Sequence, residues 1–175
     1  AQYAQLKNNL TKEMPKTKTP FTPELIAILE QALYCAVMLC YAEGLFLIKK
    51  TAAEQNWNIN PAEICRIWQG GCIIRSDLLK TLTEIYKKNP QIENLLLAPE
   101  MQKIVEENIG SLRRIASDSV RLGLPMPCLT ATVSSFDALT SDELPANFIQ
   151  GLRDYFGAHT FERNDKPGVF HFDWY

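Results

Sequence analysis

Hydrophobic residues recur along most of the chain at the three- and four-residue spacing that is typical of α-helices. The longest such stretch runs from Leu25 to about Gln55 and is apolar on almost every side. A helix-start signal precedes it, with Thr22 as N-cap and Pro23 at the first helical position. A helix that is apolar all round is normally enclosed by other helices, so we expect a buried core helix here and not a membrane span.

Glu43 interrupts this apolar stretch. A buried carboxylate is costly unless a partner compensates its charge. We therefore expect Glu43 to reach a cation or to mark a polar seam between helices. A structural pairing is favoured over a catalytic role, because nothing nearby in the sequence completes a catalytic group.

Proline and glycine residues divide the rest of the chain into further helices. Asn60 and Pro61 repeat the helix-start signal, and Gly123 and Gly157 end later apolar stripes. The glycine pair at 70–71 lacks the preceding strand and the spacing of a dinucleotide-binding loop, so we attribute it to close helix–helix approach. The predicted helices after the first span about 61–69, 78–86, 99–122, 127–139 and 145–157.

These elements predict an all-α protein, a bundle of six or seven helices, since no stretch has a strand pattern stronger than its helical one. We expect residues 1–20 to be a connector, because Pro15 and Pro20 interrupt any helix there. Residues 21–161 are predicted to form the helical domain. Residues 162–175 are predicted to form an extended tail, whose aromatic side chains need a surface in the same domain or on a partner.

The composition is that of an ordinary soluble protein. The 175 residues are 46% hydrophobic and 22% charged, with a formal net charge of -2. A nucleic-acid partner normally leaves a basic face on a protein, so we expect none here. The N-terminus has no signal-peptide pattern, and we expect no membrane association.

The cysteines bear on the compartment and on metal binding. Their number is odd, they lie in apolar runs, and no two have the Cys-x-x-Cys spacing. We therefore predict buried, reduced thiols in a cytoplasmic protein, with neither a disulfide framework nor a metal site. The residues are Cys35, Cys40, Cys65, Cys72 and Cys128.

The candidate chemistry lies near the end of the chain, at Arg153 and His159. Arg153 falls in the last full turn of a helix that ends at Gly157, and His159 follows the end. A chain reversal at Gly157 would fold the imidazole back toward the guanidinium, so that both cations reach one phosphate or carboxylate. Alternatively, Arg153 compensates the helix dipole and His159 is an ordinary loop residue. The apolar positions of this helix are Phe148, Ile149, Leu152 and Phe156.

Common catalytic motifs are missing from the sequence. It contains no HExxH, no GxSxG, no P-loop and no dinucleotide-binding fingerprint. We therefore predict no catalytic, cofactor-binding or metal-binding residue in this chain. Arg153 and His159 are interpreted as one part of a site that is completed elsewhere.

Several sequence blocks resemble the C-terminal helical domain of the decarboxylating 6-phosphogluconate dehydrogenase family. The similarity covers roughly residues 33–174, with the blocks in the family's order and spacing, whereas residues 1–30 match weakly. The blocks are Trp-Gln-Gly-Gly-Cys-Ile-Ile-Arg-Ser at 68–76, Asn-Leu-Leu-Leu at 94–97, Gly-Leu-Pro-Met-Pro-Cys at 123–128, Leu-Pro-Ala-Asn at 144–147, and Gln150 with Arg-Asp-Tyr-Phe-Gly-Ala-His-Thr at 153–160.

The resemblance implies part of an oxidoreductase of the oxidative pentose phosphate pathway and gluconate utilisation. Enzymes of this family are homodimers that oxidise and decarboxylate 6-phosphogluconate to ribulose 5-phosphate. Their NADP is bound mainly by an N-terminal Rossmann domain, and no metal is implied. By this resemblance, Arg153 and His159 contact the phosphate end of the substrate in the partner subunit's site, and the aromatic tail crosses the other subunit.

The chain also departs from the complete family pattern. It lacks the Rossmann glycines and the upstream catalytic lysine and glutamate, and Glu43 stands where the family has glutamine. We therefore expect a fragment of the enzyme that is inactive by itself, because proton and hydride transfer need groups that it does not contain. The alternative is a non-catalytic helical interaction or dimerisation module derived from the same fold.

Overall fold

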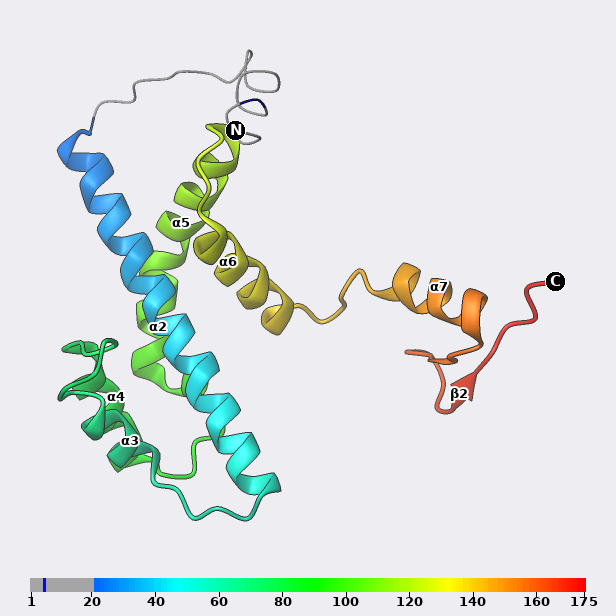
Figure 1. Ribbon diagram of the computed structural model, residues 1–175, viewed down its shortest axis with the longest axis horizontal. Coiled ribbons are helices and arrows are strands. Elements are labelled where there is room, and N and C mark those ends of the chain that lie inside the picture. Colours follow the sequence, from blue (N-terminus) through cyan, green and yellow to red (C-terminus); the bar gives the residue numbers. More distant parts are fainter. Residues whose placement is uncertain (1–4, 6–20) are drawn as a thin grey trace. The chain divides into compact units, whose positions relative to one another are not determined.

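The computed structural model describes Gln5 and residues 21–175 of the chain (Figure 1). Apart from Gln5, the predicted connector at 1–20 lies outside the described residues. Among the described residues there are six α-helices, one 3-10 helix and one two-stranded hairpin, which confirms the predicted all-α class. The described residues divide into two compact units, with the boundary between Phe136 and Asp137.

The elements follow one another with short connections. In chain order they are α2 (Pro23–Glu54), α3 (Pro61–Ile67), α4 (Leu78–Lys88), the 3-10 helix η1 (Leu95–Leu97), α5 (Pro99–Arg121), α6 (Pro127–Thr140), α7 (Asn147–Gly157), β1 (Phe161–Glu162) and β2 (Val169–Phe170).

The helix starts follow the local signals in the sequence. The Thr22 side chain accepts a hydrogen bond from the Leu25 amide at 3.2 Å. The Asn60 side chain accepts one from the Ala62 amide at 3.0 Å. These caps satisfy amides that have no partner inside their helices, which is why the two starts were predictable.

Two turns differ from the prediction. α7 begins at Asn147 and not at the preceding proline, because the Ala146 amide bonds back to the Leu144 carbonyl at 2.7 Å in a tight three-residue turn. The glycine pair at 70–71 does not mark a close helix contact, since a β-carbon on either residue would meet no atom within 4 Å. The turn itself requires Gly71, whose φ of +66° lies in the left-handed region.

The core of the first unit lies along both halves of α2. Figure 1 shows α5 alongside α2, and these two helices make the most extensive helix–helix contact. One buried cluster joins the C-terminal half of α2 to α3, α4 and η1, and a second joins its N-terminal half to α5 and α6. Fully buried members include Met38, Leu79, Leu82, Leu95, Met101 and Leu112.

A large part of the α2 surface stays uncovered. Ile26, Leu33 and Leu47 are 53%, 59% and 66% exposed. The prediction that other helices enclose α2 is therefore wrong for the described part of this chain. By length and composition α2 is also the one helix of the described residues that could cross a membrane, which by itself is weak evidence, because the core helix of a soluble protein can have the same length and composition.

The cysteines differ in their surroundings. All five are free, and burial raises the pKa of the Cys35 and Cys65 thiols to about 11. The burial predicted for Cys40 and Cys128 is wrong, since both are exposed. They line an open, largely apolar groove of about 790 Å³ along α2 and α6. The apolar residues around each cysteine in the sequence predicted burial, but they could not show that the groove is left uncovered.

Glu43 marks a polar seam. Its side chain is exposed, and the hydroxyl of Ser135 on α6 donates a hydrogen bond to its Oε1. The expectation of a buried carboxylate is therefore wrong. The carboxylate is open to solvent and accepts a hydroxyl hydrogen bond, so it needs no cation to offset burial.

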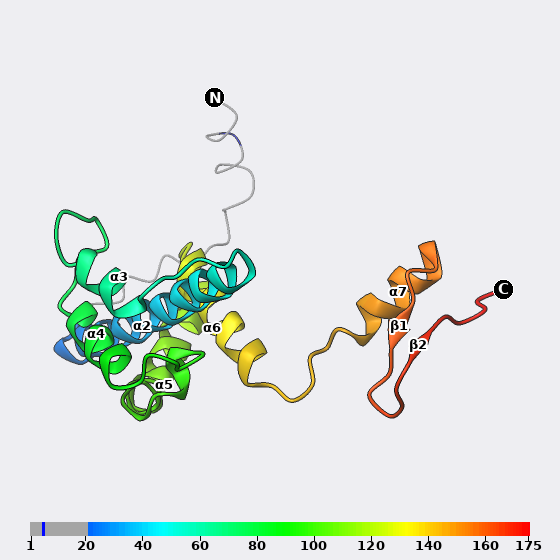
Figure 2. The same cartoon turned by 90° about the horizontal axis from the view of Figure 1, so that it is seen from below.

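The second unit consists of the end of α6, helix α7 and a small hairpin. β1 and β2 pair antiparallel, with Phe161 opposite Phe170 and Glu162 opposite Val169. Figure 2 shows the hairpin beside α7, and β1 is the strand that contacts this helix. The predicted boundary between the helical domain and the tail, at 161/162, falls inside β1.

Candidate functional site

The predicted apolar stripe of α7 is exposed in this chain. Phe148, Ile149, Leu152 and Phe156 are 79%, 58%, 50% and 65% exposed. Asp154 is instead the buried residue of α7, with no exposed surface. The sequence pattern therefore located the helix correctly but not the side that the unit buries.

Arg153 lies on the open side of α7. Its side chain is exposed, and its Nη1 donates a hydrogen bond to Oε1 of Gln150 at 3.2 Å. Gln150, Arg153 and Gly157 share one face of the helix, because they are spaced by three and four residues. The guanidinium carries five N–H groups, so the bond to Gln150 occupies a small part of its donor capacity.

His159 folds back over the end of α7. Its exposed imidazole ring lies 5.5 Å from the Phe156 ring, centroid to centroid, in an edge-to-face arrangement. A β-carbon on Gly157 would lie 2.8 Å from Cδ2 and from Nε2 of the imidazole. Gly157 is one helical turn beyond Arg153 on the same face, so the reversal brings the imidazole to the end of the face that carries the guanidinium.

The residue that makes the reversal is not the one predicted. Gly157 is the last residue of α7, and Ala158 takes the left-handed conformation, with φ 49° and ψ 38°. Glycine at 157 serves another purpose, since it leaves room for the His159 ring, which a β-carbon there would displace.

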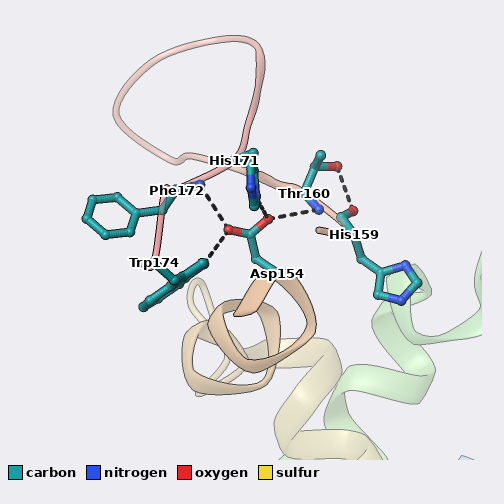
Figure 3. Close-up of polar contacts among 6 residues, drawn as sticks. All are labelled: Asp154, His159, Thr160, His171, Phe172 and Trp174. Atoms are coloured by element: carbon teal, nitrogen blue, oxygen red, sulfur yellow. Dashed lines mark hydrogen bonds and ion pairs between the residues drawn. The ribbon is translucent and has the colours of Figure 1, made fainter. Parts of the chain in front are cut away.

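Asp154 organises the second unit, and the sequence analysis did not single it out. Its Oδ1 accepts hydrogen bonds from the Thr160 amide at 3.1 Å and from His171 Nδ1 at 2.8 Å. Its Oδ2 accepts hydrogen bonds from the Phe172 amide at 3.0 Å and from Trp174 Nε1 at 2.9 Å. Figure 3 shows these donors converging on the carboxylate, while the imidazole of His159 points away from them.

The aromatic tail therefore finds part of its surface on its own unit. The Trp174 ring packs edge-to-face on Tyr155 of α7 at 5.7 Å and on Phe172 at 5.0 Å, and Tyr175 lies 5.7 Å from Tyr155. Phe172, Trp174 and Tyr175 nevertheless remain 58%, 41% and 93% exposed. The tail is thus anchored by Asp154 but only half covered.

The electrostatics of Asp154 are set by its partners. Burial alone raises the pKa of this carboxyl, but the hydrogen bonds from Phe172, His171 and Trp174 outweigh burial and lower the pKa to about 2. The carboxylate is therefore ionised throughout the physiological pH range, and its four donors compensate the charge.

The depressed pKa predicts an acid-induced release of the tail. Because the folded-state pKa lies below the ordinary aspartate value of about 3.9, the ionised carboxylate stabilises the anchored tail above pH 4, and this contribution is lost as the pH falls toward 2. The change can be followed by Trp174 fluorescence after the other two tryptophans are replaced, W57F/W68F. The same protein carrying Asp154→Asn has no carboxylate there and should show no such step; release already complete above pH 4 would contradict the assignment.

The arrangement can bind an anion. It presents a guanidinium and an imidazole at one helix end, and both groups favour phosphate or carboxylate oxygens. Among the described residues, no group of three or more His, Cys, Asp or Glu side chains is placed to hold a metal ion.

Comparison with known proteins places the chain in one family. A family model described as "6-phosphogluconate dehydrogenase, C-terminal domain" matches residues 1–174. The decarboxylating 6-phosphogluconate dehydrogenase of Escherichia coli is 43% identical over 151 residues, which are 86% of this chain and 32% of that protein. The NADP(+)-dependent decarboxylating enzyme of Bacillus subtilis is 41% identical over 159 residues, which are 91% and 34% of the two chains.

A solved structure agrees with these matches. The 6-phosphogluconate dehydrogenase of Plasmodium falciparum, whose structures include complexes with NADP+ and with 6-phosphogluconate, has a TM-score of 0.87 and 35% identity. The match covers 99% of this chain and 37% of the Plasmodium chain. The chain thus spans about a third of the length of the curated relatives it matches. It belongs to the family of 6-phosphogluconate dehydrogenase C-terminal domains.

Proposed function

We propose that this chain acts as the C-terminal part of an NADP-dependent 6-phosphogluconate dehydrogenase, which oxidises and decarboxylates 6-phosphogluconate to ribulose 5-phosphate in the pentose phosphate pathway. The family match over residues 1–174 carries the proposal. The relatives that bear this activity in their names are about three times as long as the matched region. The remaining part of such an enzyme would hold NADP and the groups that transfer the proton and the hydride.

Within this enzyme, Arg153 and His159 would bind the phosphate end of the substrate. Arg153 is exposed and has donors beyond the one that Gln150 accepts, so it suits a bidentate contact with two phosphate oxygens. His159 lies at the end of the same helix face and adds an N–H donor, which is charged when the ring is protonated. Neither residue would take part in proton or hydride transfer.

A second copy of the chain is the proposed partner. Large apolar side chains are exposed on both units, on α2 at Leu33 and Leu47 and on α7 at Phe148 and Phe156. Surfaces of this kind usually mark a protein–protein interface in a soluble protein. A homodimer, in the cytoplasm, accounts for apolar helix faces that the chain itself leaves uncovered.

The proposal predicts activity for the complete enzyme and none for residues 1–175 alone. The complete protein, supplied with 6-phosphogluconate and NADP, should form NADPH and ribulose 5-phosphate, measured by absorbance and by product analysis. Residues 1–175 should form neither, because the chemical steps need groups outside them. Turnover by residues 1–175 alone would contradict this division of roles. A complete protein that dimerises but never turns over would favour the non-catalytic dimerisation module.

A further inference from the structure

Asp154 brackets His159 within the polypeptide chain. Its backbone carbonyl accepts a hydrogen bond from the Ala158 amide at 2.9 Å, and its side chain accepts one from the Thr160 amide at 3.1 Å. The backbone amides before and after His159 therefore both donate hydrogen bonds to Asp154. These two hydrogen bonds fix the backbone on either side of His159 and hence the point from which its imidazole extends.

The backbone at this point needs such support. Ala158 and Thr160 both have positive φ, 49° and 63°. Residues other than glycine adopt this region at a cost in free energy and hold it only where the surroundings enforce it. The two hydrogen bonds to Asp154 hold these residues on either side of His159, and the Thr160 hydroxyl also donates to the His159 carbonyl at 2.6 Å.

The carboxylate is in turn fixed by the tail. His171, the Phe172 amide and Trp174 all donate to it, and it is fully buried. An acid this close to an anion site would repel the anion if its charge were exposed. Here the charge is compensated by donors and faces away from the His159 imidazole (Figure 3).

We propose that Asp154 is a positioning residue for the phosphate site: it holds His159 at the end of α7 by bonding the main chain on both sides of it, without touching the substrate. The consequence for catalysis rests on the proposed function, in which His159 contacts the substrate phosphate. Gly157 completes the arrangement by leaving room for the imidazole.

The test compares four variants of the complete enzyme: Asp154→Asn, His159→Ala, their combination, and Asp173→Asn. Asp154→Asn keeps the shape but turns one acceptor oxygen into an NH₂ group that faces donors. Asp173→Asn is the matched control, because it removes the same charge from an exposed site in the tail that Asp154 anchors.

We expect Asp154→Asn to raise the KM for 6-phosphogluconate about tenfold with little change in kcat, as does His159→Ala, since each loses about one charge-assisted contact. The control should leave the KM unchanged. The combined variant should have the KM of His159→Ala alone, because Asp154 acts through His159. Amide hydrogen exchange at Thr160 should be faster in Asp154→Asn than in the control.

The outcomes separate the two hypotheses. If His159→Ala raises the KM while Asp154→Asn does not, or if the two effects add, the positioning role is overturned and the proposed function stands. If His159→Ala leaves the KM unchanged, the proposed phosphate contact fails, and the positioning role fails with it. Should Asp154→Asn lower the thermal stability, Gly157→Ala provides a second test, since it displaces the imidazole without altering Asp154; an unchanged KM in Gly157→Ala would then overturn the inference.

Discussion

In the proposed complete enzyme, Arg153→Ala should raise the KM for 6-phosphogluconate by about 10- to 150-fold and change kcat much less, which corresponds to the loss of about 1.5–3 kcal/mol from a charge-assisted contact. The physical reason is that the guanidinium would bind the non-reacting end of the substrate equally in the ground state and in the transition state. Steady-state kinetics over a range of substrate concentrations measures the change.

The matched control is Arg163→Ala. Arg163 also lies in the second unit, but its guanidinium is already bound to the Asp165 carboxylate at 2.7 and 2.6 Å. Its removal should leave the KM unchanged. An unchanged KM in Arg153→Ala would contradict the proposal that Arg153 binds the substrate phosphate.

The second large effect concerns the uncovered face of α2. Replacing Leu33 and Leu47 by aspartate, L33D/L47D, should dissociate the proposed homodimer, because burying each leucine in its interface would contribute about 1.5–3 kcal/mol and a buried aspartate adds a desolvation cost. The fold itself should survive, since both side chains are exposed within the chain. Sedimentation or light scattering gives the oligomeric state, and circular dichroism reports the helix content.

The control for this experiment is Gln102→Asp, which adds a negative charge at an exposed polar position of α5. It should leave the dimer intact. A dimer that persists unchanged in L33D/L47D would show that this face of α2 is not the interface.

The helices could be predicted because their signals are local. Apolar spacing and the caps at Thr22 and Asn60 place α2 and α3 almost to the residue. The pattern cannot show which surface packs against the apolar face of each helix. The apolar face of α2 and the stripe of α7 predict burial, yet the chain leaves both exposed, because a helix pattern is the same whether the partner is internal or external.

The organisation around Asp154 could not be predicted, because its partners are distant in sequence. His171, Phe172 and Trp174 lie 17 to 20 residues beyond it, and no periodicity connects them to the helix. An aspartate in an amphipathic helix ordinarily indicates a solvated face. The hairpin was missed for a related reason, since strands of two residues are too short to show an alternating pattern.

The central claim is that the cations at the end of α7 complete the active site of the neighbouring subunit, and mixed dimers test it most directly. One subunit carries R153A/H159A. The other keeps Arg153 and His159 but has a replaced catalytic lysine, which the family resemblance places outside residues 1–175. At a 6-phosphogluconate concentration well below the raised KM of R153A/H159A, each parent homodimer should be nearly inactive, the first because it binds substrate weakly and the second because it lacks the catalytic lysine. Co-expression in equal amounts should restore about a quarter of the wild-type activity, because half of the dimers then contain one intact composite site. Mixed dimers that remain as inactive as their parents would contradict the claim and place the site within a single subunit.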